Sequence, residues 1–215
     1  MVQPSLTQYQ PDYDCSLCPR LVSYREDNRS RYSDWHNGPV PSFGDLNAPL
    51  LIVGLAPGLK GANRTGRPFT GDVAGDLLYP TLTKFNLARG IFGAEADDGL
   101  ELINCRITNA VRCAPPQNKV TGPETTACRP FLVAEIAKMT NLKAILALGG
   151  VAHGAVLSTL GEKKSAHPFA HGARHMLGKG LTLSDSYHCS RYNTNTGRLT
   201  VKMFDEVFQD VVSLL

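Results

Sequence analysis

The chain carries at residues 50–58 the run LLIVGLAPG, in which apolar residues lead directly into a glycine-rich turn. A short apolar run of this kind is typical of a strand buried on both faces of a parallel sheet. The small residues after it let the backbone approach a ligand closely, because glycine has no Cβ. We therefore expect an α/β fold with a ligand crevice at the carboxyl end of this strand.

The loop continues through NRTGRPFTGD at residues 63–72. It offers an aromatic ring, guanidinium groups and a carboxylate, supplied by Phe69, Arg64, Arg67 and Asp72. Such groups suit a planar, phosphorylated substrate. The loop has neither the Gly-Lys-Ser/Thr of a Walker A motif nor Gly-x-Gly-x-x-Gly spacing, which argues against nucleotide hydrolases and dinucleotide enzymes. A turn that binds nothing is the open alternative.

Further apolar runs and amphipathic segments alternate along the chain. Strands are predicted over residues 50–55, 107–111, 144–148 and 181–186, and helices over 73–87, 124–140, 150–160 and 199–215. Residues 1–49 show neither pattern. The alternation predicts one domain over residues 1–215 with three layers, in which a four-stranded, mostly parallel sheet is flanked by helices.

Composition places the chain among globular proteins. Of its 215 residues, 42% are hydrophobic and 19% charged, and no apolar run approaches the roughly 20 residues of a membrane span. Residues 1–6, MVQPSL, lack the basic start and apolar middle of a secretory signal, which favours a cytoplasmic location. The cysteines are then thiols or metal ligands rather than disulfides. A net charge of +3 permits nucleic-acid binding without requiring it.

Four cysteines suggest a metal centre. Cys15 and Cys18 form a Cys-x2-Cys pair, and Cys113 and Cys128 form a looser pair in which a proline follows each closely. Four thiolates can hold zinc or a [4Fe–4S] cluster, and the loose second pair favours the cluster. Buried, unligated thiols are the open alternative.

The two other cysteines have simpler expected roles. Cys105 lies at the entrance to a strand, where we expect it to pack. Cys189 follows His188, but adjacent residues of an extended segment point in opposite directions, so a Cys-His nucleophile is not expected.

Polar loops follow the first, second and fourth predicted strands, at residues 54–72, 112–119 and 187–198. The carboxyl ends of parallel strands share one edge of a sheet, and ligands bind there. Side chains that are far apart in sequence are therefore expected to converge at that edge.

Together these segments resemble the uracil-DNA glycosylase superfamily, and within it the iron–sulfur type B group, or family five. The similar segments are GLAPG at residues 54–58, ITNAVRCAPP at 107–116 and HCSRYNT at 188–194. Cys189 stands where the group usually has proline, and Leu55 where type A enzymes have Glu. The resemblance implies the fold of that superfamily, a structural [4Fe–4S] cluster, and removal of uracil and other deaminated bases such as hypoxanthine from DNA, leaving an abasic site.

A glycosylase flips the target nucleotide out of the duplex, stacks its base and reads its edge. Phe69 suits the stacking role, and the Asn109 amide offers a donor and an acceptor for the uracil edge. Ala56 and Gly58 leave room for the base, and Asn193 is expected to assist at the sugar or base. A core ring at Phe69 and a turn-capping amide at Asn109 are the alternatives.

Loss of the base leaves an oxocarbenium-like sugar and an anionic pyrimidine, so the site needs negative charge for the first and a donor for the second. Asp72 fits the first role, and the resemblance also gives its Gly-Asp position catalytic importance. His188 fits the second role as donor to the pyrimidine oxygen. Asp72 also suits the N-cap of the next helix, a role that competes or coexists with catalysis, and a core or capping His188 is the other alternative.

We expect DNA to be the partner. Arg64, Arg67, Arg191 and Tyr192 are predicted to contact it, at the phosphates or as a wedge. The location is then cytoplasmic and nucleoid-associated, and a monomer is sufficient. His167, His171 and His175 have a spacing that suggests zinc, but no fourth ligand is evident, and a DNA-contacting loop is favoured. A non-catalytic iron–sulfur or zinc nucleic-acid-binding module and a zinc-stabilised hydrolase are the competing functions.

Overall fold

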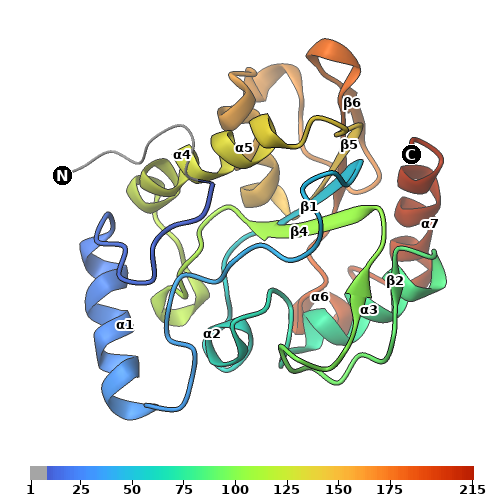
Figure 1. Cartoon of the computed structure of the whole chain (residues 1–215). Helices are drawn as coiled ribbons and strands as arrows, with labels where there is room; N and C mark the ends of the chain where they lie inside the picture. The colour runs from blue at the N-terminus through green and yellow to red at the C-terminus, as the bar shows by residue number, and fades with distance from the viewer. Residues whose placement is uncertain (1–8) are drawn as a thin grey trace.

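The computed structural model describes residues 9–215, so the prediction drawn from residues 1–6 lies outside the described residues. A five-stranded sheet with the order β4-β1-β5-β7-β6 forms the centre (Figure 1). Its strands are β1 (Leu50–Gly54), β4 (Cys105–Asn109), β5 (Ala144–Leu148), β6 (Arg174–Met176) and β7 (Thr182–Ser186). The first four in spatial order are parallel, as predicted, and β6 is antiparallel to β7 at the edge. The α/β prediction is confirmed, with five strands instead of four.

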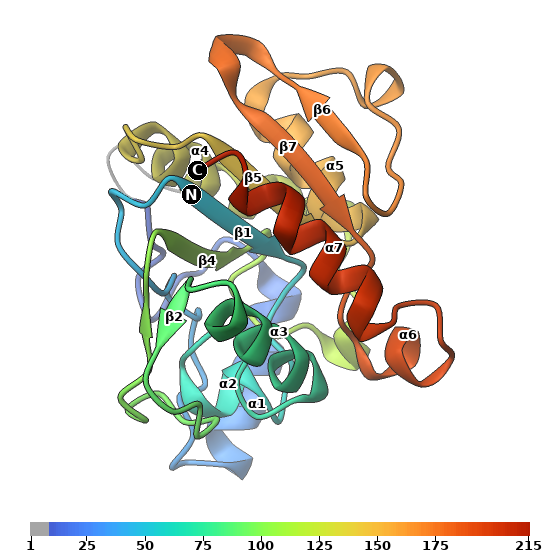
Figure 2. The same ribbon diagram turned by 90° about the vertical axis from the view of Figure 1, so that its right-hand side faces the viewer.

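Helices cover both faces of the sheet (Figure 2). They are α3 (Val73–Lys84) and α7 (Val201–Val212) on one face, and α4 (Gly122–Lys138) and α5 (Gly150–Leu160) on the other. In β1, Leu50 and Ile52 pack toward α3 and α7, while Leu51 and Val53 pack toward α4 and α5. Alternate residues of a strand point to opposite faces, so a strand with two covered faces must be apolar throughout.

Smaller elements complete the described fold. They are α1 (Pro19–Arg31), α2 (Ala62–Thr65), α6 (Arg191–Asn195), the 3-10 turns η1 (Pro116–Asn118), η2 (Lys164–Ala166) and η3 (Gly178–Gly180), and the short antiparallel pair β2 (Ala88–Arg89) and β3 (Glu101–Leu102). Helix α1 lies where the sequence shows no periodic pattern. Most of its residues are polar, and it buries only Leu21, Arg25 and Asn28.

Two differences from the predicted strands have a clear physical reason. Strand β4 occupies residues 105–109 instead of 107–111, because its neighbour β1 ends at Gly54, which is paired with Asn109. Ala110 and Val111 lie beyond this last pair and donate their N–H groups to the carbonyls of Gly54 and Leu55 at 2.9 and 3.0 Å. Strand β6 was not predicted because it has three residues and both Arg174 and Met176 are exposed, so it shows no apolar alternation.

The helix predictions agree more closely. Helix α5 has the predicted bounds, α3 ends at Lys84 instead of residue 87, and α4 begins two residues before residue 124, at Gly122. Among residues 9–215, no helix has both the length and the apolar character that crossing a membrane requires.

Candidate active site

A cleft of about 770 Å³ opens at the carboxyl ends of the parallel strands. Its walls come from the three polar loops that the sequence singles out. The lining residues include Ala56, Gly58 and Asp72 after β1, Pro115 and Asn118 after β4, and His188, Arg191 and Tyr192 after β7. The predicted convergence of distant loops at one edge of the sheet therefore occurs.

Asp72 both caps a helix and faces the cleft. Its Oδ1 accepts a hydrogen bond from the N–H of Gly75 at 3.2 Å, which makes it the N-cap of α3. Its Oδ2 lies against the glycine turn, where a Cβ added to Gly58 or Gly61 would stand 3.2 or 2.9 Å from it. Burial raises the pKa of Asp72 above its ordinary value, against the lowering effect of the helix N–H groups. One carboxylate therefore has two separate tasks available to its two oxygens.

His188 forms part of the opposite wall of the cleft. Its carbonyl accepts a hydrogen bond from Nδ2 of Asn193 at 2.8 Å, and its Cβ lies beside Gly149, which has φ +99°. Burial lowers the pKa of His188, so the ring is neutral at pH 7 and carries a single N–H donor. Its ring stacks on Phe69 with a centroid separation of 6.1 Å.

Phe69 and Asn109 meet above Gly54. A Cβ on that glycine would overlap Oδ1 of Asn109 and stand 2.6 Å from Cζ of Phe69, so only glycine permits this arrangement. Phe69 has φ +57°, a conformation rare for an aromatic residue. Both side chains are buried, at 7% and 3% exposure, and neither lines the cleft. Among the described residues the Asn109 amide has no hydrogen-bond partner, which leaves its donors and acceptor available.

The other expected substrate contacts divide into two groups. Ala56 and Gly58 line the cleft, as a base pocket at this turn requires. Asn193 does not line it. Its amide is bound to the carbonyl of His188, and it borders a separate hollow beside Arg198. The structure thus places Asn193 as a support for His188.

The structure contradicts the prediction that Arg67 contacts DNA. Its side chain is only 4% exposed, and its two terminal nitrogens bond to the carboxylate of Asp98 at 2.6 and 2.5 Å. The rings of Phe43, Tyr79 and Phe92 surround the guanidinium. Arg67 therefore holds the glycine-rich loop to the segment before β3 and has no free face for DNA. Its partner Asp98 lies 31 residues away, and no local sequence signal marks it.

The remaining predicted DNA contacts lie at the surface. Arg191 and Tyr192 line the mouth of the cleft, and the Tyr192 side chain is 71% exposed. Arg64 is part-exposed and pairs with Glu95 at 2.8 Å. Lys60 and Asn118 also line the cleft, although the sequence did not single them out. Asn118 has φ +56°, a left-handed conformation that asparagine adopts more readily than most residues.

The four predicted metal ligands surround one small apolar cavity, together with Leu21, Val111 and Phe131. They come from three segments, since Cys15 and Cys18 precede α1, Cys113 follows β4, and Cys128 lies in α4. Burial, and then repulsion by neighbouring thiolates, raises the pKa of Cys18 to about 11 and that of Cys113 to about 12. Thiols with raised pKa values lose their protons at neutral pH only when a cation lies among the sulfurs. The four cysteines therefore fit a metal centre.

The two other cysteines lie in the core. Cys105 donates to the carbonyl of Leu87 at 3.2 Å, in agreement with its predicted packing role. Cys189 is fully buried, and burial, together with the nearby Asp72 carboxylate, raises the pKa of its thiol well above the ordinary range. A buried thiol next to a carboxylate cannot serve as an activated nucleophile.

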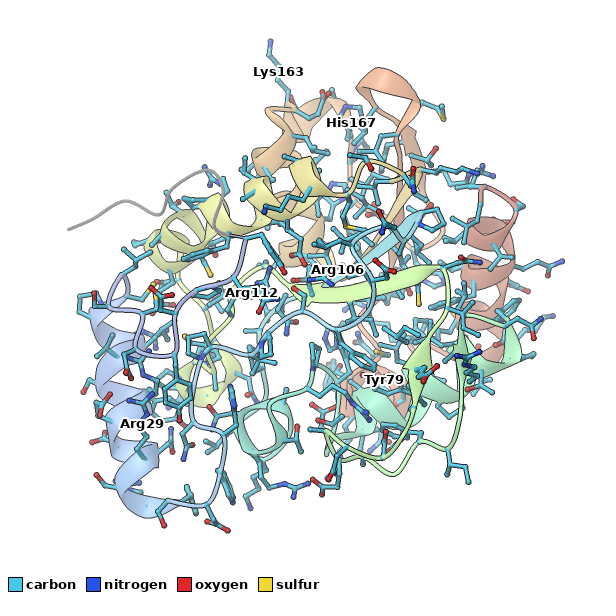
Figure 3. The ribbon with its side chains drawn as sticks, viewed as in Figure 1. Arg29, Tyr79, Arg106, Arg112, Lys163 and His167 are labelled. Atoms are coloured by element: carbon cyan, nitrogen blue, oxygen red, sulfur yellow. The ribbon has the colours of Figure 1, made fainter. Side chains whose placement is uncertain are left out.

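A buried ion-pair network joins β4 to α4 and thereby fixes the edge that carries Asn109 and Cys113. Glu135 of α4 is fully buried and accepts from Arg106 at 2.6 Å, Arg112 at 2.5 Å and Thr108 at 3.0 Å. Figure 3 shows both arginines beside β4. Burial alone raises the pKa of Glu135, but the two guanidinium groups hold it below its ordinary value.

We expect Glu135→Gln to lower the free energy of unfolding by about 3–5 kcal/mol, because it leaves buried guanidinium charge without a counterion. Urea denaturation measures this loss. The matched control is Glu101→Gln, which breaks a pair with Arg89 whose side chains are 72% and 60% exposed. Less than about 1 kcal/mol is expected there. Similar losses in the two variants would contradict a structural role for the buried network.

Comparison with known proteins agrees with this geometry. Residues 41–212 match the model of the uracil DNA glycosylase superfamily. The chain is 46% identical to a type-5 uracil-DNA glycosylase of Thermus thermophilus, with 93% of each chain covered. Identity is 43% to the type-5 enzyme of Mycobacterium bovis (93% of this chain, 78% of the relative) and 42% to that of Pyrobaculum aerophilum (91% and 87%). The chain belongs to the uracil-DNA glycosylase superfamily.

Proposed function

We propose that this protein is a uracil-DNA glycosylase, a hydrolase that cleaves the N-glycosidic bond of uracil in DNA and leaves an abasic site. The observation that carries the proposal is that a carboxylate and a neutral imidazole, Asp72 and His188, line one cleft from two different strand ends. Its relatives at 42–46% identity carry the same activity in their names. DNA repair is the corresponding role.

In the proposed reaction the bond between C1′ and the base nitrogen breaks, and its electron pair leaves with the base. Asp72, as a carboxylate, stabilises the cationic sugar and takes a proton from the water that attacks C1′. Neutral His188 donates its N–H to the pyrimidine oxygen on which negative charge gathers. The lowered pKa of His188 suits this role, because a neutral ring stabilises the anion by a hydrogen bond and does not transfer a proton to it.

The base would lie at the glycine turn. Ala56 and Gly58 have small side chains or none, so they leave space in the cleft beside Asp72. The unpartnered amide of Asn109 and the ring of Phe69 lie next to Gly54. We propose that the flipped base stacks on Phe69 and pairs its edge with Asn109. Both are buried in the free protein, so this contact requires the glycine turn to move as the base enters. The small side chains of the turn support acceptance of hypoxanthine as well as uracil.

DNA would lie across the mouth of the cleft. Arg191 and Lys60 supply positive charge there for phosphates, and Tyr192 is exposed enough to enter the space that a flipped nucleotide leaves. Arg64 can join them if DNA displaces Glu95. A single chain holds all of these groups, so we propose that the protein acts as a monomer and associates with the nucleoid, where its substrate lies.

The activity is tested by incubating the purified protein with a duplex that contains one deoxyuridine. Alkali-labile abasic sites are expected from this duplex and from one with hypoxanthine, and none from a matched thymine duplex. Binding of DNA without any abasic product from either damaged base would overturn the proposal and favour a non-catalytic nucleic-acid-binding module.

We also propose that Cys15, Cys18, Cys113 and Cys128 hold a structural [4Fe–4S] cluster, with zinc the less favoured alternative. The cluster would supply cross-links between three segments of chain, and neither step of the hydrolysis needs electrons. The apolar cavity supports this role, as do its four thiols, which come from the segment before α1, the segment after β4 and α4.

Iron and sulfide analysis with visible absorption tests the cluster. Four irons and four sulfides per chain are expected, with a broad absorption band in the visible range. Cys113→Ser should lose this band and the iron, while the control Cys105→Ala, whose thiol packs in another part of the core, should keep both. Stoichiometric zinc without iron or sulfide would assign the site to zinc instead.

A further inference from the structure

A second cluster of possible metal ligands lies outside the cleft and the four-cysteine site. It consists of His153 of α5, His175 of β6 and Asp185 of β7, whose ligand atoms all lie within 4.8 Å of one another. Nδ1 of His153 stands 2.7 Å from Oδ1 of Asp185, and Nε2 of His175 stands 3.2 Å from Oδ2. The Asp185 side chain is fully buried, and those of the two histidines are 5% and 11% exposed. None of the three lines the cleft.

Both ring nitrogens of His153 face oxygen atoms. Its Nε2 lies 2.8 Å from the carbonyl of His167, and its Nδ1 faces the Asp185 carboxylate. A carbonyl can only accept, so the proton of a neutral ring resides on Nε2, and Nδ1 then points a lone pair at a carboxylate oxygen. A cation must lie between these two atoms, and it is either a second proton or a metal ion.

We propose that His153, His175 and Asp185 bind a zinc ion. Two imidazoles and a carboxylate are a common donor set for zinc. The carbonyl of His167 holds the outer nitrogen of His153, as outer partners usually do for metal-binding histidines. Nε2 of His167, which is labelled in Figure 3, stands 3.5 Å from Oε2 of Glu162, and His167 is not among the three donors. Water would complete the coordination of the ion.

The spacing of the donors suits such an ion. Two ligands bound at 2.0–2.1 Å with tetrahedral angles stand about 3.3 Å apart. The 3.2 Å separation between His175 and Asp185 already matches this value. Nδ1 of His153 stands 2.7 Å from the other carboxylate oxygen, Oδ1, so His153 must move away from it by roughly half an ångström for both imidazoles to bind one ion.

The elements involved indicate what the ion would do. Strand β6 is three residues long, has only β7 as a neighbour in the sheet, and follows the loop that contains η2. An ion bound to α5, β6 and β7 would join this edge strand to the body of the fold. It would therefore stabilise the protein without taking part in the reaction, whose proposed groups lie on the cleft.

The test uses the full-length protein with its four-cysteine site loaded. After dialysis against a mild chelator, zinc is added back and the bound ion is measured by elemental analysis and calorimetry. We expect one zinc per chain beyond the metal of the cysteine site, and an increased Tm. His175→Ala should weaken zinc binding by at least about tenfold. The control His171→Ala, in the loop before β6 and outside the ligand set, should bind zinc as the wild type does.

Cobalt substitution separates this site from the cysteines. Cobalt bound here should show d–d bands without thiolate-to-cobalt charge transfer. Charge transfer, unchanged affinity in His175→Ala, or no uptake by the wild type would each overturn the proposal, and the last result would assign the cation beside His153 to a proton. Asp185→Asn should also lose zinc, and if that variant does not fold, His175→Ala decides.

Discussion

Asp72→Asn is expected to lower kcat by about 10²–10⁴-fold, the usual range for loss of a general base, while KM for DNA and Tm change little. The helix cap and the proposed catalytic role of this residue use different oxygen atoms. The Oδ1 atom of an asparagine can still accept from the Gly75 N–H, so α3 keeps its cap. Only the charge that Oδ2 presents to the glycine turn is lost. Single-turnover rates on a uracil duplex, with binding measured separately, give both quantities.

Two controls define the Asp72 prediction. Asp76→Asn removes a carboxylate in the first turn of the same helix and should leave the activity at neutral pH unchanged, because the Asp76 charge only raises the pKa of Asp72. Asp72→Ala removes the cap as well and should cost about 1 kcal/mol of stability beyond the catalytic loss. An equal loss of rate and of DNA affinity in Asp72→Asn would mean that the residue is a structural cap only.

The pH dependence provides a second check on Asp72. The proposed reaction needs the carboxylate, so activity is present above its pKa and falls as the pH drops through that value. Burial raises this pKa, and the acidic limb of the rate profile should therefore lie above the pH at which an exposed aspartate titrates. The limb should be absent from the residual activity of Asp72→Asn.

Local sequence patterns predicted the parts of the fold that local forces determine. Strand β5 and helix α5 have their predicted bounds because an apolar run ends at Gly149, which opens the helix, and Gly161 closes it. The convergence of three loops also follows from the sequence, since parallel strands place their carboxyl ends at one edge.

Tertiary contacts determine the features that the sequence did not predict, such as the burial of Arg67, Phe69 and Asn109. The sequence shows Arg67 beside other candidate DNA contacts, but Asp98 and three aromatic rings bury it. The burial of Phe69 and Asn109 depends on their meeting over Gly54, and three separate segments must pack before that happens. No local pattern reports such a meeting.

The histidine cluster shows the same limit. Sequence spacing draws attention to His167, His171 and His175, which lie in one loop and the strand after it. Of these three histidines, only His175 belongs to the cluster of possible metal ligands in the structure. The other two members are His153 of α5 and Asp185 of β7. His171 instead accepts from the backbone N–H of Tyr187. Sheet pairing between β6 and β7 brings the ligands together, and the sequence did not predict β6.

The second large effect is expected from His188→Phe, which should lower kcat by about 10²–10³-fold, the usual loss when one donor to a developing anion is removed. Phenylalanine keeps an aromatic ring against Phe69 but has no ring nitrogen that can donate, so the stacked contact should persist while the donor is lost. Asn193→Ala, which frees the His188 carbonyl, should cause a smaller loss because the donor remains but is less well held.

The leaving group tests the role of His188 directly. A donor that stabilises the departing base matters less when the base is a better anion, so His188→Phe should lose less activity on 5-fluorouracil than on uracil. Asp72→Asn should lose similar activity on both bases, because the role proposed for Asp72 is toward the sugar and the water. If His188→Phe showed the same loss on both bases, the imidazole would not be holding the charge of the leaving pyrimidine, and its place in the cleft would serve packing alone.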